Sequence, residues 1–508
     1  MIIKDSNTLI NSLIRYAREK LSLHVADETY LTNLLLAKLH CVDYQYHREP
    51  VNNIDDLITS IEQLAITKKL ATAETIDSFT IAIMGMISPL PSLVNERFFK
   101  LLKDFSPDKA CKYLFALQVD NNYIKQSRIK LNLFWKASFP GNHLEITINL
   151  SKPEKDNKLT AKLAQEAAVN YPKCILCYEN LGYAGRINSP ARQNIRLIDF
   201  KLANEDWFMQ FSPYQYYEEH VVVINKSHTN MKIDQETFEK LCDFVDLFPN
   251  YFVGSNASLP IVGGSILNHE HFQGGKHIMP IFSAPMKYSF NKKGYDDCQI
   301  SYLDWYNSCL KIVSPNRESI IKIASEILAI WTIYEDKQID LIPYSTAQHN
   351  AITPIIQKID NCYHLYIILR NNRTSEEHPD GIFHAHQQFH NIKKESIGLI
   401  EASGLFILPG RLKRQFTLVS EILTGTISLE AALDKHPDLS VHQAMIMQLQ
   451  KEYPSLKSRK SAEEIIEKYI NETCKQILEC TAIFKNNAIG ENHLLQFLNK
   501  VGLEKIGG

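Results

Sequence analysis

The chain has 508 residues, 45% of them hydrophobic and 22% charged, which is typical of a folded protein with a large core and excludes the disordered and fibrous classes. Its 55 Lys and Arg against 57 Asp and Glu give a net charge of −2, so no overall positive field attracts nucleic acid or an anionic membrane. Without a leader pattern or an apolar run of membrane-spanning length, and with ten scattered cysteines, we expect a cytoplasmic protein with reduced thiols.

Helical patterns dominate the first part of the chain. Apolar residues recur at three- and four-residue spacing in 12–21 and 54–64, which predicts a helical N-terminal region over 1–115. The alternation of apolar and polar residues over 144–150 then predicts a half-buried strand, and a turn is expected at 151–156.

An α/β unit is predicted over 116–290, in the order strand, helix, strand, loop, strand. The β-branched segment 217–224 predicts the first of these strands, and 251–256 predicts the second. Asp234 is the expected N-cap of the helix between them. The apolar face of this helix is formed by Phe238, Leu241, Val245 and Phe248.

The second half of the chain repeats the change from helix to strand. Helix is clearest at 320–334, and strands are expected at 349–354, 363–369 and 382–390. The predicted boundaries are 291–340 for a helical connection, 341–415 for a second strand-rich unit and 416–508 for a helical C-terminal region. The predicted fold class is therefore α+β, with two α/β units between helical ends.

The segment 268–275, with the sequence Asn-His-Glu-His-Phe-Gln-Gly-Gly, carries the strongest chemical signal. In an extended chain, side chains at every second position share a face, so His269, His271 and Gln273 are expected to converge. Two histidines at this spacing also occur by chance or in a core. The glycines before and after the pair favour a ligand site, because they let the main chain approach a phosphate closely. The expected substrate-binding residues there are Asn256, Gly263, Gly264 and Ser265.

His271 is the predicted nucleophile. A neutral imidazole attacks an activated phosphorus well, and the phosphoryl-imidazole divides a nucleotidyl transfer into two displacements. Gln273 is expected to donate its NH₂ to the phosphoryl oxygen as charge builds there. Because a carboxamide cannot titrate, it gives no acid help to a poor leaving group, which favours a transferase with a sugar phosphate as leaving group over a hydrolase.

Cys174 and Cys177 are separated by two residues, a spacing suited to zinc in a reduced compartment. Structural thiols and a redox pair are the alternatives. His228 and His269 are the histidines expected to complete a tetrahedral site. His220 is an alternative third ligand, although its place among apolar strand residues equally fits a hydrogen-bonded core histidine.

Two further polar segments each allow more than one interpretation. Arg186 and Arg192 suit bidentate phosphate binding, but a solvated basic loop is the alternative, and Asn256 also suits a turn. The second histidine-rich segment holds His378, His384, His386 and His390, and predicts either a second metal site or a polar interface. No P-loop or Rossmann fingerprint is present.

These residues resemble the galactose-1-phosphate uridylyltransferases, most closely their second, bacterial class. The resemblance covers most of the chain, and its most specific part is 255–275. Shorter matching stretches are 144–155, 182–186, 392–401 and 408–411. In this family, which belongs to the histidine-triad-like superfamily, the second histidine of the motif carries UMP, and that position is His271.

The resemblance implies two histidine-triad-like units with mainly antiparallel sheets and flanking helices. It implies exchange of uridylyl between UDP-glucose and galactose 1-phosphate, giving glucose 1-phosphate and UDP-galactose. It also implies a zinc site of two cysteines and two histidines, here Cys174, Cys177, His228 and His269, and a homodimer whose second half helps to complete the nucleotide site.

The chain departs from the family at Ser189 and Ile195, where this class is expected to have histidines, which puts the sugar-phosphate contacts of that loop in doubt. The second metal site of some relatives lacks a clear carboxylate here, so iron is not expected. The alternatives are a dinucleoside polyphosphate phosphorylase or hydrolase of the same superfamily, and a nucleotide-binding module without turnover.

Overall fold

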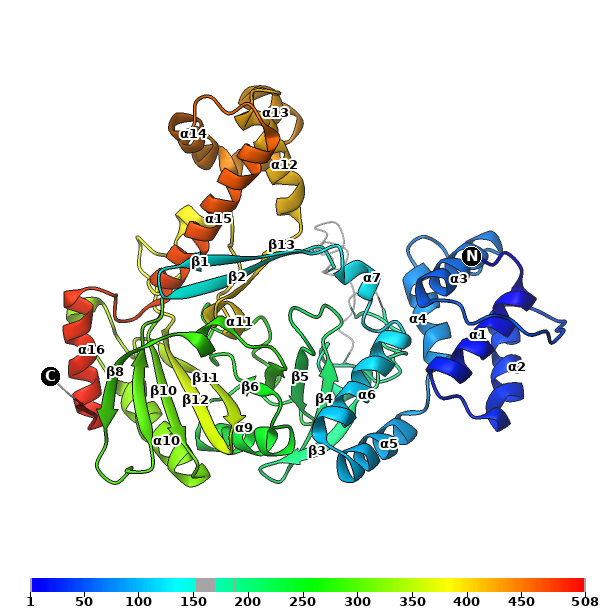
Figure 1. The fold of residues 1–508 in the computed structure, drawn as a ribbon, viewed down its shortest axis with the longest axis horizontal. Helices are drawn as coiled ribbons and strands as arrows, with labels where there is room; N and C mark the ends of the chain where they lie inside the picture. The colour runs from blue at the N-terminus through cyan, green and yellow to red at the C-terminus, as the bar shows by residue number, and fades with distance from the viewer. Residues whose placement is uncertain (1, 152–169, 187–188, 507–508) are drawn as a thin grey trace. The chain divides into compact units, whose positions relative to one another are not determined.

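The computed structural model describes residues 2–151, 170–186 and 189–506, shown as a ribbon in Figure 1. The chain forms two compact units. Unit 1 comprises 1–130, 155–230 and 268–276, and unit 2 comprises 131–154, 231–267 and 277–508. After residue 230 the chain returns to unit 1 only for the short segment that carries His269, His271 and Gln273.

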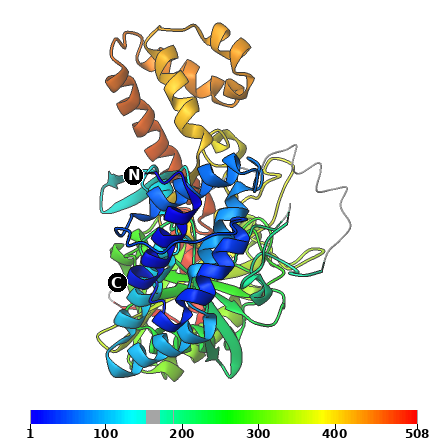
Figure 2. The same ribbon diagram turned by 90° about the vertical axis from the view of Figure 1, so that its right-hand side faces the viewer.

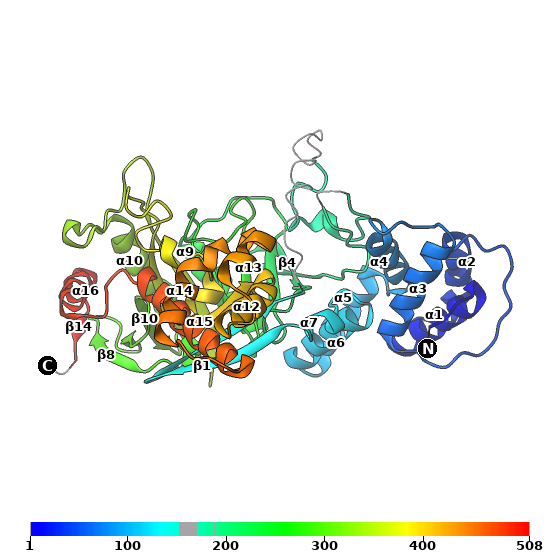
Figure 3. The same cartoon turned by 90° about the horizontal axis from the view of Figure 1, so that it is seen from above.

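The first part of unit 1 is helical, as the sequence predicted. α1 begins after Asp5 and α6 after Ser106, and each of these side chains accepts a hydrogen bond from an N–H of the first turn. Helices α1 to α4 lie together in Figures 1 and 3. The helices are α1 (Ser6–Lys20), α2 (Glu28–Lys38), α3 (Ile54–Thr67), α4 (Ile76–Ile87), α5 (Pro91–Asp104), α6 (Pro107–Asp120) and α7 (Gln126–Ile129).

The strands of unit 1 form an antiparallel array in the order β7-β5-β4-β3. Ala203 and Asn204 both have positive φ, as a two-residue turn between twisted strands requires, and they join the first two strands of the unit. The strands are β3 (Ile198–Leu202), β4 (Glu205–Phe211), β5 (Val221–Asn225) and β7 (His271–Gly275). The apolar layer beneath them includes Trp207 and Phe272, whose stacked rings lie 4.8 Å apart.

Unit 2 has two sheets. In the smaller one, β2 (Asn142–Asn149) pairs with β1 (Leu133–Phe139) in antiparallel fashion and with β13 (Leu405–Pro409) in parallel. The larger sheet has the strand order β14-β8-β9-β10-β12-β11-β6, and each pair of neighbouring strands is antiparallel. Its strands are β6 (Phe252–Gly254), β8 (Met286–Asn291), β9 (Gln299–Leu303), β10 (Cys309–Ser314), β11 (Asn350–Ile359), β12 (Cys362–Asn371) and β14 (Glu504–Lys505).

Some helices of unit 2 pack against its larger sheet, and others, which follow later in the chain, pack against one another. α9 (Gln235–Leu247) and α10 (Arg317–Ile333) contact β11. α12 to α15 gather in one bundle, seen in both Figure 1 and Figure 2. The remaining helices are α11 (Leu399–Ala402), α12 (Arg411–Leu423), α13 (Leu429–Lys435), α14 (Gln443–Glu452), α15 (Arg459–Thr481) and α16 (Ala488–Val501).

The α+β fold class and the order of elements around the motif are confirmed. Asp234 caps α9 through a reciprocal pair of hydrogen bonds with Thr237, so the predicted helix start is correct. The predicted strand at 217–224 begins only at Val221, because the preceding residues form a turn in which Glu219 has positive φ. The domain boundaries drawn from the sequence stay a prediction, and the predicted turn at 151–156 lies almost wholly outside the described residues.

Two predictions of secondary structure were wrong. The region 291–340 contains α10 and a 3-10 turn at Lys337–Ile339 but is not a helical connection, because β9 and β10 occupy much of its first half. The predicted strand at 382–390 is absent; instead a short 3-10 helix spans Gln387–Phe389. There the main chain bonds to itself locally, with the N–H of Phe389 donating to the carbonyl of His386.

Among the described helices, none alone is long and apolar enough to cross a membrane. One bent pair, α4 with α5, meets the length and composition test, with an angle of 59° between its halves.

Candidate active site and metal cluster

The register of β5 and β7 sets the direction of the motif's side chains. Ile224 lies opposite His271, and Val222 lies opposite Gln273. Directly opposed residues of an antiparallel pair share a face, so His271 and Gln273 point to the same side while Phe272 enters the core. The predicted alternation is thus correct for these two residues. His269 lies before the strand begins, and its ring is directed into a separate cluster.

That cluster joins Cys174, Cys177, His228 and His269. The Sγ atoms of Cys174 and Cys177 are 3.6 Å apart. Nδ1 of His269 lies 3.2 Å from Sγ of Cys174, and Nδ1 of His228 lies 3.1 Å from Sγ of Cys177. All four ligand atoms lie within 4.8 Å of one another. The structure therefore brings together the four residues that the sequence selected as metal ligands.

The tautomer of His269 is set by the main chain. Its Nε2 lies 2.8 Å from the carbonyl oxygen of Asn225, and because a carbonyl only accepts, Nε2 carries the proton. Nδ1 then presents its lone pair to the thiols, as a metal ligand requires. The side chain of Asn225 donates to the carboxylates of Glu270, at 2.9 Å, and Glu205, at 3.0 Å. These bonds fix the peptide that holds the His269 ring.

His271 is oriented in the opposite sense. Its Nδ1 lies 2.8 Å from the carbonyl oxygen of His269, so Nδ1 carries the proton and Nε2 is the unprotonated nitrogen. Burial lowers the pKa of His271 to about 4, against the opposing effect of this hydrogen bond. The imidazole is therefore neutral near pH 7. A neutral ring with a fixed tautomer is the form in which histidine acts as a nucleophile.

The cluster and the nucleophile are linked through two residues of main chain. The His269 side chain is held by the cysteines, and the His269 carbonyl holds the His271 ring. A shift of the cluster therefore moves the hydrogen bond that orients Nε2. Gln273, two residues further along the same face, adds an amide donor beside it. This arrangement can form a covalent bond from Nε2 and stabilise negative charge next to it.

His220 is not a member of the cluster, so its prediction as an alternative metal ligand is wrong among the described residues. It precedes β5 and is 3% exposed, with Tyr216 and Tyr217 against its ring. Burial lowers the pKa of His220 to about 3, and the side chain of Gln273 opposes that change. The alternative prediction, a hydrogen-bonded core histidine, is correct in that His220 is buried. It does not agree with the hydrogen bonding, because neither ring nitrogen has a partner in the described structure.

The predicted glycine-rich loop belongs to unit 2, and there the structure brings Asn256 and the glycines together. A Cβ on Gly264 would lie 2.8 Å from Nδ2 of Asn256, and one on Gly263 would lie 2.3 Å from the carbonyl oxygen of Ala257. Only glycine fits such close approaches. Oδ1 of Asn256 accepts from the N–H of Leu399 at 2.8 Å. Asn256 is buried and Ser265 is exposed.

The arginines of the predicted phosphate loop make bonds within unit 1. Arg186 donates to the carbonyl of Tyr171 at 3.1 Å, and Arg192 donates to the hydroxyl of Tyr123 at 3.1 Å. Ser189 and Ile195, the positions that depart from the family, are both buried. Ile187 and Asn188, between Arg186 and Ser189, lie outside the described residues.

The histidine rings of the second histidine-rich segment do not lie on one strand face, so this prediction was wrong. His386 and His390 each contact a carbonyl a few residues away, those of Ile382 at 3.2 Å and Ala385 at 3.1 Å. The ring of His378 stacks on His386 at 4.0 Å. Within the described part of the chain, the cysteine–histidine cluster of unit 1 is the group whose potential ligand atoms converge.

Comparison with known proteins agrees with this geometry. The models of the N-terminal and C-terminal domains of galactose-1-phosphate uridyl transferase match residues 36–233 and 243–438. The chain belongs to the galactose-1-phosphate uridyl transferase family. It is 38% identical to the galactose-1-phosphate uridylyltransferase of Fusobacterium nucleatum over 97% of this chain and 99% of that one. The enzyme of the same name from Caldanaerobacter subterraneus is 37% identical, with both chains covered completely.

The solved structures that were matched are more distant. Yeast Ap4A phosphorylase Apa2 is 10% identical to this member of the family, covers 64% of this chain and 88% of its own, and has a TM-score of 0.32. A likeness of that size adds nothing to the assignment of fold or function.

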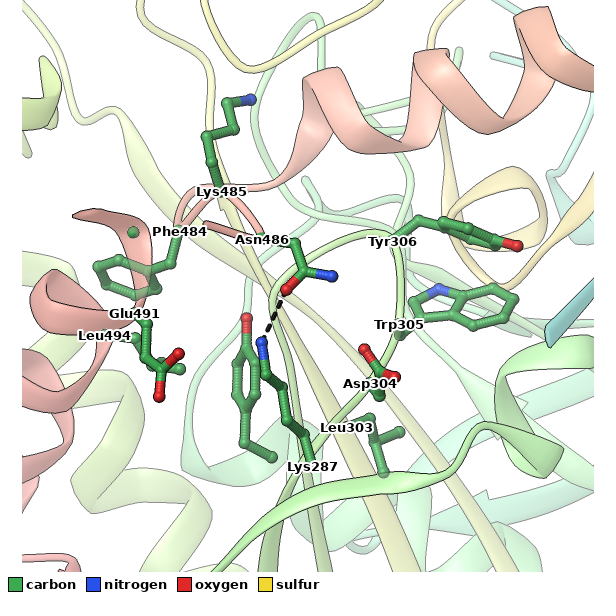
Figure 4. A pocket seen from close by; sticks show the side chains of 12 residues that line it. Lys287, Leu303, Asp304, Trp305, Tyr306, Phe484, Lys485, Asn486, Glu491 and Leu494 are labelled. Atoms are coloured by element: carbon green, nitrogen blue, oxygen red, sulfur yellow. Dashed lines mark hydrogen bonds between the residues drawn. The ribbon is translucent and has the colours of Figure 1, made fainter. Parts of the chain in front are cut away.

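One pocket of unit 2 is lined by none of the predicted site residues (Figure 4). Its charged residues are Lys287, Lys485, Asp304 and Glu491, and Nζ of Lys287 donates to Oδ1 of Asn486 at 2.7 Å. It has neither a histidine nor a cysteine in its lining.

Sequence reasoning missed Asn225, Glu270 and the importance of His220. Asn225 ends a β-branched strand and precedes His228 by three residues, which was a usable signal for a residue bonded near the ligand. Glu270 lies between the two histidines of the motif. The sequence identified His220 only as a metal ligand or a core histidine, because its place beside Gln273 depends on which residue lies across the sheet from it.

Proposed function

We propose that this protein is a UDP-glucose:hexose-1-phosphate uridylyltransferase that transfers UMP from UDP-glucose to galactose 1-phosphate through His271. The observation that supports this most directly is the hydrogen bond from Nδ1–H of His271 to the carbonyl of His269, at 2.8 Å. That bond leaves Nε2 as a nucleophile on a buried, neutral ring. Membership of the family supplies the substrates.

The reaction proceeds by two displacements at one phosphorus atom. The Nε2 lone pair of His271 forms a bond to the α-phosphorus of UDP-glucose as the bond from that phosphorus to the bridging oxygen breaks. Glucose 1-phosphate leaves with the electron pair. A phosphate oxygen of galactose 1-phosphate then attacks the uridylyl-histidine, UDP-galactose forms, and Nε2 recovers its lone pair.

Gln273 stabilises charge on the phosphoryl oxygens through its NH₂ in both displacements. It supplies no proton, and none is needed, because a sugar phosphate leaves as a weakly basic anion. A site without a titrating group at this position also gives water little help as an attacker. The covalent adduct therefore persists until a phosphate acceptor arrives.

We propose zinc for the cysteine–histidine cluster. With bond lengths of about 2.3 Å to sulfur and about 2.0 Å to nitrogen, a tetrahedral zinc ion separates its ligand atoms by about 3.3–3.8 Å. Four separations among the ligand atoms are 3.1, 3.2, 3.6 and 3.8 Å, and all of these atoms lie within 4.8 Å of one another. The residues therefore fit the ion after small movements of their side chains. With four protein ligands the ion would brace the loop before β7 rather than bind substrate.

The remaining contacts to substrate are proposals within each unit. Arg186 and Arg192 in unit 1, and Asn256, Gly263, Gly264 and Ser265 in unit 2, are the residues we propose for binding the nucleotide and the sugar phosphate. We also propose a cytoplasmic homodimer, on the basis of the resemblance to the family. Light scattering coupled to size-exclusion chromatography measures the subunit number.

The covalent intermediate is the direct test. Incubation with UDP-glucose alone should leave one UMP on His271, labile to acid and stable to base, and galactose 1-phosphate should discharge it as UDP-galactose. His271→Asn should carry no UMP and should have no activity. An active wild-type enzyme without an adduct on His271 would refute the proposal. Turnover of a dinucleoside polyphosphate with inorganic phosphate, but not of UDP-glucose, would instead indicate the phosphorylase.

A further inference from the structure

The histidine just before β5 lies next to the catalytic amide. The register of β5 with β7 ends with Val221 opposite Gly274. The N–H of Ser212 donates to the carbonyl of His220, which continues the pairing of β4 with β5 by one residue. His220 therefore lies across from Gly275. Since alternate residues share a face, its side chain is on the side of His271 and Gln273.

Gly275 makes room for this arrangement. A Cβ there would lie 2.8 Å from Cε2 of Tyr217 and 2.9 Å from the carbonyl oxygen of Glu219. The ring of Tyr217 occupies that space, and its centroid lies 4.4 Å from the His220 ring. Tyr216 lies against the same imidazole at 5.4 Å. The two tyrosine rings hold the imidazole beside the strand that carries Gln273.

His220 is costly as a packing residue. It is 3% exposed, and neither Nδ1 nor Nε2 has a hydrogen-bond partner in the described structure. A buried polar group without a partner destabilises a fold, and an apolar ring would avoid that loss. Gln273 is the one side chain that raises the pKa of His220 against the lowering effect of burial. The amide of Gln273 is therefore close to the ring, although the two groups do not form a complete hydrogen bond.

We propose that His220 is a positioning residue that donates an N–H to Oε1 of Gln273 and thereby turns the NH₂ of Gln273 toward the transferring phosphoryl group. This inference rests on the proposed function and extends it. A carboxamide presents either its oxygen or its NH₂ to a neighbour, and the two orientations have opposite effects on a phosphoryl oxygen. When Oε1 accepts from His220, only the NH₂ remains for the phosphoryl oxygen. A buried ring that stays neutral can supply this N–H without adding a charge.

The test compares three single variants and one double variant. His220→Phe keeps an aromatic ring and removes both nitrogens, and His220→Gln keeps an N–H donor. We expect His220→Phe to lower kcat for uridylyl exchange by about 10- to 100-fold with KM nearly unchanged, and His220→Gln to recover most of kcat. In a Gln273→Ala background, His220→Phe should cause no further loss, because the histidine acts through the amide.

Thermal unfolding separates positioning from packing. His220→Phe should unfold at the wild-type temperature or above it, since it removes unpartnered polar atoms from the interior. Tyr216→Phe, which keeps the ring next to His220, is the matched control and should retain wild-type kcat. Undiminished kcat in His220→Phe, or a loss that adds fully to that of Gln273→Ala, would overturn the inference.

The outcome for the proposed function is read separately. Each variant is incubated with UDP-glucose, and UMP on His271 is measured over time. An adduct that forms in the wild type but slowly in His220→Phe supports both ideas. An adduct that forms at the wild-type rate in His220→Phe refutes only the positioning role. Absence of the adduct in the active wild type refutes the covalent mechanism itself.

Discussion

Replacement of Cys177 by serine tests the link between the cluster and the nucleophile. Cys177 is 4% exposed, and its Sγ lies within 3.8 Å of three potential ligand atoms, those of Cys174, His228 and His269. Cys174 and His269 each make two such contacts, and His228 makes one. Serine offers a poor ligand for zinc, so we expect Cys177→Ser to lose most of its metal.

The expected loss of stability follows from linkage. A metal present at about 1,000 times its dissociation constant stabilises the folded state by about 4 kcal/mol. Unit 1 has about 200 residues, a size at which each kcal/mol changes the midpoint of thermal unfolding by about 2–4 °C. Cys177→Ser should therefore unfold about 8–16 °C below the wild type. Activity should also fall, because the loop before β7 carries the carbonyl that orients His271.

The assay is metal analysis of the purified protein together with thermal unfolding, each with and without a chelator. Cys111→Ser is the matched control, because Cys111 is a buried thiol of α6 outside the cluster. It should keep its metal. Equal metal content in Cys177→Ser and wild type would remove Cys177 from the ligand set. A wild type that is free of metal and indifferent to chelator would show that hydrogen bonds alone hold the four residues.

Three smaller predictions concern two residues of β7 in unit 1 and one carboxylate of unit 2. Phe272→Ala should destabilise the protein by about 3–5 kcal/mol in urea unfolding, because the ring is fully buried and stacked on Trp207, whereas Phe272→Leu should cost far less; equal losses would contradict this packing. Gly275→Ala should lower both stability and kcat, by about 1–3 kcal/mol in stability, since its Cβ would meet Tyr217; an unaffected variant would show that the loop relaxes freely. Burial raises the pKa of Glu145, but its bonds with His277 and Lys136 more than offset this and leave the pKa below its ordinary value of 4.5. The stability advantage of wild type over Glu145→Gln should therefore be full above pH 4.5 and shrink at lower pH; an advantage that grows on acidification would reverse the assigned sign.

Sequence rules predicted best those features that depend only on neighbouring residues. The alternation that places His271 and Gln273 on one face depends only on the two-residue period of a strand, and it is confirmed within β7. The N-cap at Asp234 depends on side-chain bonds within four residues. The same rule failed for His269 and for 382–390, because alternation was assumed where the chain is not extended.

The sequence by itself determined which chemical groups are available: two thiols two residues apart, an imidazole at position 271 and an amide that cannot titrate. The tertiary structure alone decided which ring nitrogen carries the proton, because the carbonyl of Asn225 fixes the tautomer of His269 and the carbonyl of His269 fixes that of His271. It also decided that His220 lies beside Gln273 rather than among the metal ligands, since that choice depends on strand pairing between residues about 50 positions apart. The type of each residue sets which reactions and bonds its side chain can take part in. Its tautomer and its neighbours are set by contacts with segments that are distant in the sequence.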